Sequence, residues 1–313
     1  MRILEHFNLR PLTHFKIGGP ARFFTEVKSE EELKEAVDFS EKKKIPFVAL
    51  GAGSNVLVSD AGYPGLVIRV LALDIKIDGT HVHAGAGVPN AVLVAETVRA
   101  GLAGLEWAIG IPGSVGGSVR GNAGCFSGEM KDVVERVKFY NAKTKKFEEK
   151  DKKFCDFRYR ESIFKTSPYL VITHIVLALH KGNPETSGRM VRHYSRERTD
   201  VQDIGSASAG CVFKNIPWPK GEAHRKRLLF LLPELAEFKD RLTIPVSFLI
   251  DHGAGLKGKK IGGVHISRKH ANYFINNGHA RAEEVIMLIG LVKEYVHRKF
   301  DLYLEEEIQY IGM

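Results

Sequence analysis

Apolar residues at helical spacing predict several amphipathic helices. Residues 29 to 43 open with Ser29-x-x-Glu32, a capping-box pattern that satisfies the free amides at a helix start. The apolar face that follows comprises Leu33, Ala36 and Val37. Near the end of the sequence, a longer stripe comprises Val285, Leu288, Ile289, Val292 and Val296. Residues 188 to 199 predict a further, basic helix.

Short apolar runs between these segments predict strands. The runs span residues 47 to 50, 56 to 58, 66 to 70, 82 to 86, 133 to 141 and 170 to 179. Asn90 is predicted to cap a helix that Gly101 closes. This mixture of helices and strands predicts an α+β fold. The string KGNPETS at residues 181 to 187 has linker composition, so we place the main domain boundary there.

Glycine is concentrated in one segment. Residues 110 to 129, GIPGSVGGSVRGNAGCFSGE, hold seven glycines and no Lys, Asp or His. So many glycines in a non-repetitive run bring the backbone close to a flat or anionic group. Upstream, LGAGSN at residues 50 to 55 follows an apolar run, and the amides of such a turn can cradle a phosphate. The two segments predict one long cofactor that carries a diphosphate.

Two common nucleotide-binding motifs do not fit this pattern. Gly51-x-Gly53 lacks the third glycine of G-x-G-x-x-G, and residues 56 to 62 predict a strand and a turn where a Rossmann site has a helix. The P-loop sequence GxxxxGK[ST] does not occur.

Seven blocks follow one another along the chain. They are THFKIGGPA at 13 to 21, LGAGSN at 50 to 55, GIPGSVGGSVRGNAG at 110 to 124, YRES at 159 to 162, SAGCVFKN at 208 to 215, LID…GLKG…IGG at 249 to 263 and LEEEIQYIG at 304 to 312. In this order the blocks resemble the UDP-N-acetylenolpyruvoylglucosamine reductase (MurB) family. The sequence lacks the extra length of the longer family subtype, so it resembles the shorter type II subtype.

The resemblance implies an FAD enzyme of peptidoglycan precursor synthesis. Such an enzyme reduces UDP-N-acetylglucosamine enolpyruvate to UDP-N-acetylmuramate, with NADPH as the hydride donor. The implied fold is an FAD-binding domain of the PCMH/VAO-like type at residues 1 to 181, with subdomains at about 1 to 75 and 76 to 181. An α+β substrate-binding domain would follow at residues 182 to 313.

Three residues match the catalytic positions of the family. Arg160 of the YRES block would stabilise negative charge that develops on the substrate, since a guanidinium suits a planar carboxylate. Cys211 stands where the family usually has a proton-donating serine, and a thiol with a pKa near 8.5 is the stronger acid. Glu307 matches the glutamate that assists the proton relay. Without the resemblance, these residues would be taken for a surface arginine, a buried cysteine and a solvated acidic run.

Binding residues are carried over from the matching blocks. Cofactor binding is expected from Gly51, Ala52, Gly53, Ser54, Asn55, Pro112, Gly113, Ser114, Gly116, Gly117 and Ala123. Substrate binding is expected from Tyr159, Lys214, Asn215 and His270. Departures from the family pattern occur at Arg120, Gly121, Glu306 and Gln309, where the family usually has an aromatic, a larger residue, a proline and a substrate-holding arginine.

Composition and charge limit the classes of binding partner that we expect. The net charge of +9 fits polyanionic small molecules, and the basic residues are scattered without interleaved aromatics, so we expect a UDP-sugar partner and no nucleic acid. Three cysteines without a CxxC pair indicate a reducing cytoplasm. No run of 18 apolar residues occurs, so no membrane partner is expected. His81-x-His83 lacks a third ligand, so no metal site is expected.

The sequence leaves undecided the role of one segment and the choice between the main function and two alternatives. Residues 216 to 246 are longer than the usual family connection, and their leucines at helical spacing suit either core packing or a contact surface on an otherwise monomeric protein. The rival functions are another FAD oxidoreductase on the same fold and a non-enzymatic flavin-binding relative. Cys211 and Gln309 are the departures that would favour the latter.

Overall fold

The chain divides into two compact units, each with its own hydrophobic core. A computed structural model describes all residues, 1 to 313. Unit 1 comprises Met1–Asn8, Pro20–Ser54 and Gly62–Asp200, and unit 2 comprises Leu9–Gly19, Asn55–Ala61 and Val201–Met313. The domain limits 1 to 181 and 182 to 313 stay a prediction, and residues 182 to 200 lie in unit 1.

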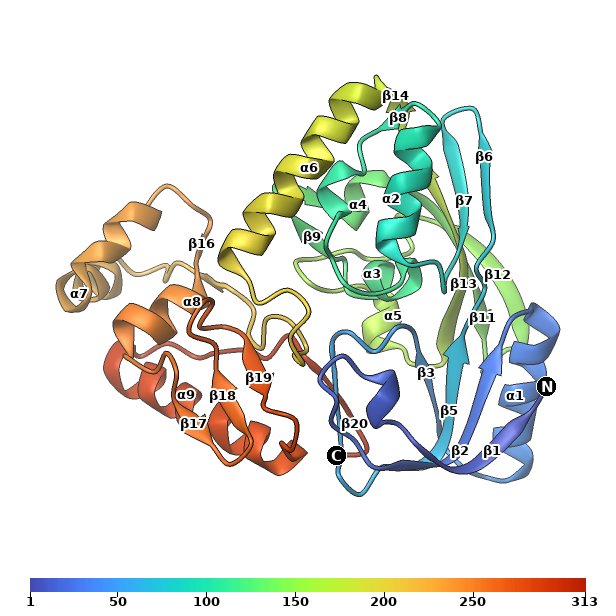
Figure 1. The fold of residues 1–313 in the computed structure, drawn as a ribbon, viewed down its shortest axis with the longest axis horizontal. Coiled ribbons are helices and arrows are strands. Elements are labelled where there is room, and N and C mark those ends of the chain that lie inside the picture. The colour runs from blue at the N-terminus through green and yellow to red at the C-terminus, as the bar shows by residue number, and fades with distance from the viewer. The chain divides into compact units, whose positions relative to one another are not determined.

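The first sheet of unit 1 has the strand order β1-β2-β5-β3. Its strands are β1 (Ile3–Asn8), β2 (Pro20–Val27), β3 (Phe47–Leu50) and β5 (Tyr63–Val70). β1 pairs antiparallel with β2, whereas β5 runs parallel to both of its neighbours. Helix α1 (Glu30–Lys42) packs against β2 and β5 (Figure 1).

Helix α1 begins as its capping pattern predicts. Ser29 Oγ accepts a hydrogen bond from Glu32 N at 3.3 Å, and Glu32 Oε2 accepts one from Lys28 N at 2.7 Å. Leu33, Ala36 and Val37 are buried, so the predicted apolar face is confirmed.

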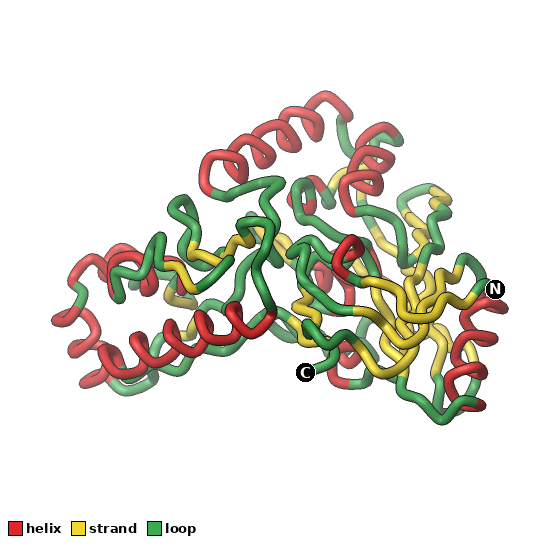
Figure 2. Tube along the Cα trace, turned by 60° about the horizontal axis from the view of Figure 1, so that its bottom comes forward, coloured by secondary structure: helices red, strands yellow, loops and turns green.

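The second sheet of unit 1 is antiparallel throughout, in the order β12-β11-β13-β7-β6. Its strands are β6 (Ile75–Asp78), β7 (His81–Gly85), β11 (Val134–Asn141), β12 (Lys146–Asp151) and β13 (Leu170–Ala178). Helix α3 (Val115–Arg120) packs against β7 and β13 (Figure 1). Figure 2 shows the strands of both sheets gathered near the N-terminus.

Smaller elements complete unit 1. The strand pairs are β8 (Leu102–Ala103) with β14 (His180–Lys181) and β9 (Gly124–Cys125) with β10 (Gly128–Glu129). The helices are α2 (Asn90–Arg99), α4 (Met130–Val133), α5 (Ile163–Thr166), α6 (Pro184–Val201) and a single turn at Glu106–Ala108.

Two local predictions in unit 1 were wrong. Asn90 does not cap α2: the N-cap residue is Pro89, and the Asn90 amide donates to Ser118 Oγ at 2.8 Å inside the core. The predicted linker is largely helical, because Asn183 Oδ1 accepts from Glu185 N at 2.9 Å and so lets α6 start at Pro184. Gly101 does close α2, with a φ of +70°.

Unit 2 combines a long helix with short strands. Helix α9 (Ala282–Phe300) packs against β17 (Lys260–Ile261) and β18 (Val264–Ile266), and all five residues of its predicted stripe are buried. The other elements are a single turn at Arg10–Leu12, β4 (Val56–Val58), β15 (Ile216–Pro217), α7 (Glu222–Leu231), a 3₁₀ turn at Pro233–Phe238, β16 (Thr243–Ile244), α8 (Val246–Phe248), a π turn at Leu249–Gly253, β19 (Phe274–Asn276) and β20 (Gln309–Ile311).

The 216 to 246 segment contributes to the core of unit 2. Its buried leucines are Leu228, Leu232 and Leu235. Strand β4 pairs in parallel with β20, so the early segment Asn55–Ala61 joins the end of the chain. The predicted α+β class is confirmed by these mixed elements.

Candidate active site

The two glycine-rich turns of unit 1 lie side by side, although about 60 residues separate them. A Cβ atom built on Gly51 would lie 2.5 Å from Ser114 Oγ, and one built on Gly113 would lie 2.7 Å from Ser54 Oγ. Gly113 has a φ of +130°, which side chains rarely tolerate. Only glycine at these two positions lets the turns come this close, as in the glycine-rich turns that bind phosphate through their backbone. We call this meeting point of residues 51 to 54 with residues 113 and 114 the hollow.

Ser114 carries the chemical signal of the hollow. Its side-chain oxygen is buried and has no hydrogen-bond partner, and the residue is 3% exposed. A buried hydroxyl without a partner is costly, so it marks a place where a bound polar group would complete the bonding. The residues present therefore fit the diphosphate of FAD.

The other predicted cofactor residues differ in their surroundings. Gly116 is needed for packing, since its Cβ would lie 2.7 Å from Ala86 Cβ and 3.0 Å from Ala86 O. Ala52 is half-buried, and Pro112 and Gly117 are exposed. Gly53 is buried and has a φ of +67°. Ala123 uses its backbone in bonds to Ser118 and Met130. Asn55 belongs to unit 2, and its amide donates to Glu307 O at 3.2 Å.

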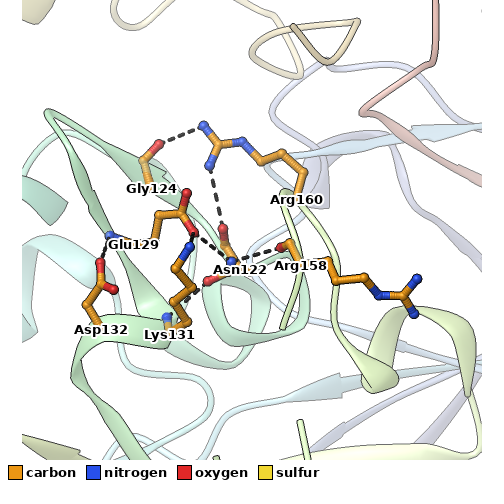
Figure 3. Close-up of polar contacts among 7 residues, drawn as sticks. All are labelled: Asn122, Gly124, Glu129, Lys131, Asp132, Arg158 and Arg160. Carbon is orange, nitrogen blue, oxygen red and sulfur yellow. Dashed lines mark hydrogen bonds and ion pairs between the residues drawn. The ribbon is translucent and has the colours of Figure 1, made fainter. Parts of the chain in front are cut away.

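Arg160 lies in a tight turn of unit 1. Arg158 and Glu161 bond each other's backbone at 3.0 and 3.1 Å, so Tyr159 and Arg160 form the tip. The Arg160 backbone is left-handed, with a φ of +56°. Its guanidinium donates to Gly124 O at 2.7 Å and to Asn122 O at 3.5 Å (Figure 3). The cation is thus held by carbonyls of the glycine-rich segment.

Tyr159 and Arg120 complete the surroundings of this turn. The Tyr159 side chain is 40% exposed, and its ring centroid lies 5.3 Å from Arg160 Cζ. Arg120 is half buried, and burial lowers the pKa of its guanidinium. Arg120 O accepts from Ser162 Oγ at 2.7 Å, which links the end of α3 to the YRES block.

Cys211 and Glu307 are neighbours within unit 2. Glu307 N donates to Val212 O at 2.7 Å, so the acidic block runs directly beside the cysteine block. On its other side, Val212 N donates to Asn272 O at 2.8 Å. The Asn272 side chain bonds both backbone groups of Phe213, at 2.8 and 3.0 Å. Cys211 is half buried, and its backbone pairs with that of Tyr273 in an isolated antiparallel β-bridge.

The three consecutive glutamates have different surroundings. Glu305 Oε1 lies 2.5 Å from Lys214 Nζ, and Glu306 Oε1 lies 2.8 Å from Lys293 Nζ on α9. Lys214 is buried at 6% exposure, so Glu305 neutralises an internal cation. The Glu305 side chain is itself 67% exposed, so it stays solvated although it pairs with Lys214, whereas the Glu306 side chain is only 24% exposed. In the backbone register Glu306 lies opposite Phe213 and Glu307 opposite Val212, so Glu307 is the member of the run nearest to Cys211.

Three further predicted residues are tied into the scaffold of unit 2. Asn215 Oδ1 accepts from Val246 N at 3.1 Å, which fixes the start of α8. The His270 ring lies edge-on to Tyr273, with centroids 4.9 Å apart. Gln309 Nε2 donates to Glu307 O at 3.2 Å, so this side chain steadies the backbone of the acidic block.

Sequence reasoning missed two buried asparagines at the site. Asn122 is 0% exposed and Asn272 is 2% exposed. Asn122 has a φ of +41°, a conformation that asparagine tolerates better than most residues. An asparagine between glycine and alanine could therefore have indicated a left-handed backbone at this position. Asn272 has no comparable signal in a single sequence.

No group of three His, Cys, Asp or Glu side chains is arranged to hold a metal ion. No helix combines the length and the apolar character that crossing a bilayer requires.

Comparisons with known proteins cover both units. The FAD binding domain family matches residues 21–147, and the UDP-N-acetylenolpyruvoylglucosamine reductase C-terminal domain matches residues 202–311. A reductase of that name from Caldicellulosiruptor bescii is 36% identical over 315 residues, covering 100% of this chain and 91% of the relative. One from Synechococcus sp. is 34% identical over 316 residues, covering 99% of this chain and 92% of the relative.

A solved structure agrees with the sequence comparisons. The crystal structure of the reductase (MurB) from Thermus caldophilus superposes with a TM-score of 0.77 at 33% identity, covering 99% of this chain and 98% of that one. The family resemblance predicted from the seven blocks is thereby confirmed. With whole-length relatives above 30% identity and matching domains at both ends, the chain belongs to the UDP-N-acetylenolpyruvoylglucosamine reductase family.

Proposed function

We propose that this protein is the NADPH-driven, FAD-dependent reductase of peptidoglycan precursor synthesis that converts UDP-N-acetylglucosamine enolpyruvate to UDP-N-acetylmuramate. The observation that carries the proposal is the hollow at Ser114, where two glycine-rich turns meet around a buried hydroxyl without a partner. It lies in a chain that matches reductases of this name over its whole length. When bound, FAD supplies hydride from NADPH to one carbon of the enol ether.

The cofactor would be held by the hollow. The amides of residues 51 to 54 and the Ser114 hydroxyl would bind its diphosphate, because the two turns lie against each other at Gly51 and Ser114. Gly113 and Gly117 would let the cofactor approach the backbone closely. Asn55 would act on this site through the backbone of its turn, since its side chain bonds Glu307 O.

Arg160 would stabilise charge on the substrate. Addition of hydride to one carbon of the double bond pushes negative charge toward the adjoining carboxylate. A guanidinium is planar and cationic, which matches a carboxylate, and two backbone carbonyls hold this one in position. Tyr159, exposed at the tip of the same turn, would contact the substrate beside Arg160.

Cys211 would complete the reduction by giving its Sγ proton to the second carbon. The thiolate left behind would then recover a proton, with the Glu307 carboxyl as the relay. The backbone bond between Glu307 N and Val212 O supports this exchange, because Val212 follows Cys211 directly in the chain. Lys214, Asn215 and His270 belong to the segments around them and would bind the anionic and polar parts of the UDP-sugar.

The purified protein gives a direct test. We expect it to be yellow from bound flavin, to be bleached by NADPH under anaerobic conditions, and to recover its colour when the enolpyruvyl UDP-sugar is added. Recovery with oxygen alone would favour a different FAD oxidoreductase, and a flavin that NADPH does not bleach would favour a non-enzymatic relative. A colourless protein that does not bind added FAD would refute the proposal.

Location and assembly form the finer part of the proposal. The three free thiols suit the reducing cytoplasm, where the UDP-sugar and NADPH are present. We expect a monomer, although Phe230 and Leu242 of the 216 to 246 segment are 84% and 92% exposed and could form a contact. Sedimentation of the wild type and of Phe230→Ser at micromolar concentrations distinguishes the two states.

A further inference from the structure

Asn122 is fully buried, and its side chain makes three hydrogen bonds. Its Nδ2 donates to Glu129 Oε2 at 2.9 Å and to Arg158 O at 2.9 Å. Its Oδ1 accepts from Lys131 N at 3.0 Å (Figure 3). One amide therefore joins its own segment to two others, the start of α4 and the turn at Arg158. Two acceptors on one side with a donor on the other fix its orientation.

The backbone of the same residue touches Arg160. Asn122 O accepts from an Arg160 guanidinium nitrogen at 3.5 Å, and Gly124 O accepts from the other at 2.7 Å. Residue 122 thus donates to the turn that carries Arg160 and also accepts from the end of the Arg160 side chain. The contacts close a ring that fixes both ends of one arginine (Figure 3).

From this ring we infer that Asn122 is a positioning residue for Arg160. It ties the Arg158–Glu161 turn to the carbonyls that hold the guanidinium, so the cation is in place before the substrate arrives. The inference rests on the role proposed above for Arg160. Preorganised charge is more effective than charge that must be ordered during the reaction, and a long side chain left loose would lose rotamer freedom at that moment.

The local backbone shows why the ring needs this amide. Arg160 and Asn122 both have left-handed backbones, with φ of +56° and +41°. Such conformations persist only where surrounding contacts determine them. The turn itself has two backbone bonds, between Arg158 and Glu161, and the amide of Asn122 is the side-chain bond that anchors Arg158 O to the glycine-rich segment.

Asn122→Gly is the cleanest perturbation. Glycine tolerates a positive φ and keeps the carbonyl that Arg160 uses, so only the amide is removed. Asn122→Asp serves as a second variant, since it keeps the size and the acceptor for Lys131 N but replaces the donor. Asn141→Gly is a matched control, because the Asn141 amide also bridges a turn, donating to Glu148 at 3.0 Å and accepting from Lys143 N at 3.1 Å, without contact to Arg160.

We expect Asn122→Gly to retain flavin absorbance and to be reduced by NADPH at a near-normal rate. Its transfer of hydride to the enolpyruvyl substrate should fall roughly 10- to 100-fold, with kcat affected more than KM, since misplaced catalytic groups cost about this much. Asn141→Gly should match the wild type in both half-reactions. In an Arg160→Lys background, Asn122→Gly should add less than about twofold, because both changes remove the same interaction.

The outcomes separate this inference from the proposed function. If Arg160→Lys leaves hydride transfer to the substrate unchanged, the role of Arg160 fails and the inference fails with it. If Arg160→Lys is slow but Asn122→Gly is as fast as the wild type, the inference alone is overturned. A full additional loss in the Arg160→Lys background, flavin loss, or failure of both Asn122 variants to fold would assign Asn122 to general stability and also overturn it.

Discussion

Gly51→Ala tests the phosphate hollow by filling it with one methyl group. The new Cβ would lie 2.5 Å from Ser114 Oγ, and since ordinary contact begins near 3.4 Å, the hydroxyl would have to move by about 1 Å. The protein without FAD can relieve this contact by turning the hydroxyl away. The cost therefore falls on the FAD-bound state, in which that oxygen would bond a phosphate.

Overpacking of this kind costs about 1–3 kcal/mol, which corresponds to a roughly 5- to 150-fold higher dissociation constant for FAD. Quenching of FAD fluorescence during titration of the apoprotein measures it. Gly290→Ala is the matched control, because no atom lies within 4 Å of its added Cβ. Introducing Ser114→Ala removes the clashing oxygen, so Gly51→Ala should then have no further effect.

Two results would refute this reasoning. Gly51→Ala could bind FAD within about twofold of the wild type, which would mean that the hollow does not hold the cofactor. Alternatively, Gly51→Ala could weaken binding equally in the Ser114→Ala background, which would mean that the loss has another cause.

Three further predictions concern unit 2. Glu307→Gln should depress turnover by orders of magnitude. Glu305→Gln should lower the free energy of urea unfolding by about 1–2 kcal/mol, a value between those of exposed and buried ion pairs, because it weakens the bond to buried Lys214. A larger turnover loss for Glu305→Gln than for Glu307→Gln would contradict the backbone register. Cys211→Ala should bind FAD and accept hydride from NADPH but fail to reduce substrate in stopped-flow experiments, whereas Cys211→Ser should keep substantial activity; full activity in Cys211→Ala would leave the proton to water or Glu307. Iodoacetamide should inactivate the wild type faster as pH rises, because the thiolate is the reacting species. It should spare Cys211→Ser, since burial raises the pKa of Cys155 to about 12 and also raises the pKa of Cys125, so these two thiols react slowly. Equal inactivation of both proteins would exclude Cys211 as the target.

Periodic elements were the most predictable parts of the fold. Helix α9 and the start of α1 follow directly from apolar spacing and a local cap, which act within a few residues. Strand β12 was missed because KFEEKD has one aromatic among charges, and such a sequence forms a strand only as an edge beside β11. Its pairing partner, and not its own pattern, determines its conformation.

The candidate site was predictable in its residue types more than in its contacts. The glycine blocks predicted a phosphate hollow, but the pairing of Gly51 with Ser114 depends on tertiary packing. The separate partners of Glu305 and Glu306 also come from distant segments, which a single sequence does not indicate. Asn122 is the clearest case, since its importance lies in joining three segments at once.

The parallel pairing of β4 with β20 has a consequence for synthesis of the protein. Asn55 and Glu307, 252 positions apart, share a hydrogen bond, and at typical translation rates the earlier residue waits roughly 10 to 50 s for its partner. Phe15 and Leu57 belong to the same late core, so these apolar segments emerge from the ribosome long before they can be buried. A fragment starting at residue 201 would lack both segments, and we expect it to aggregate when expressed alone even though it contains a complete family domain.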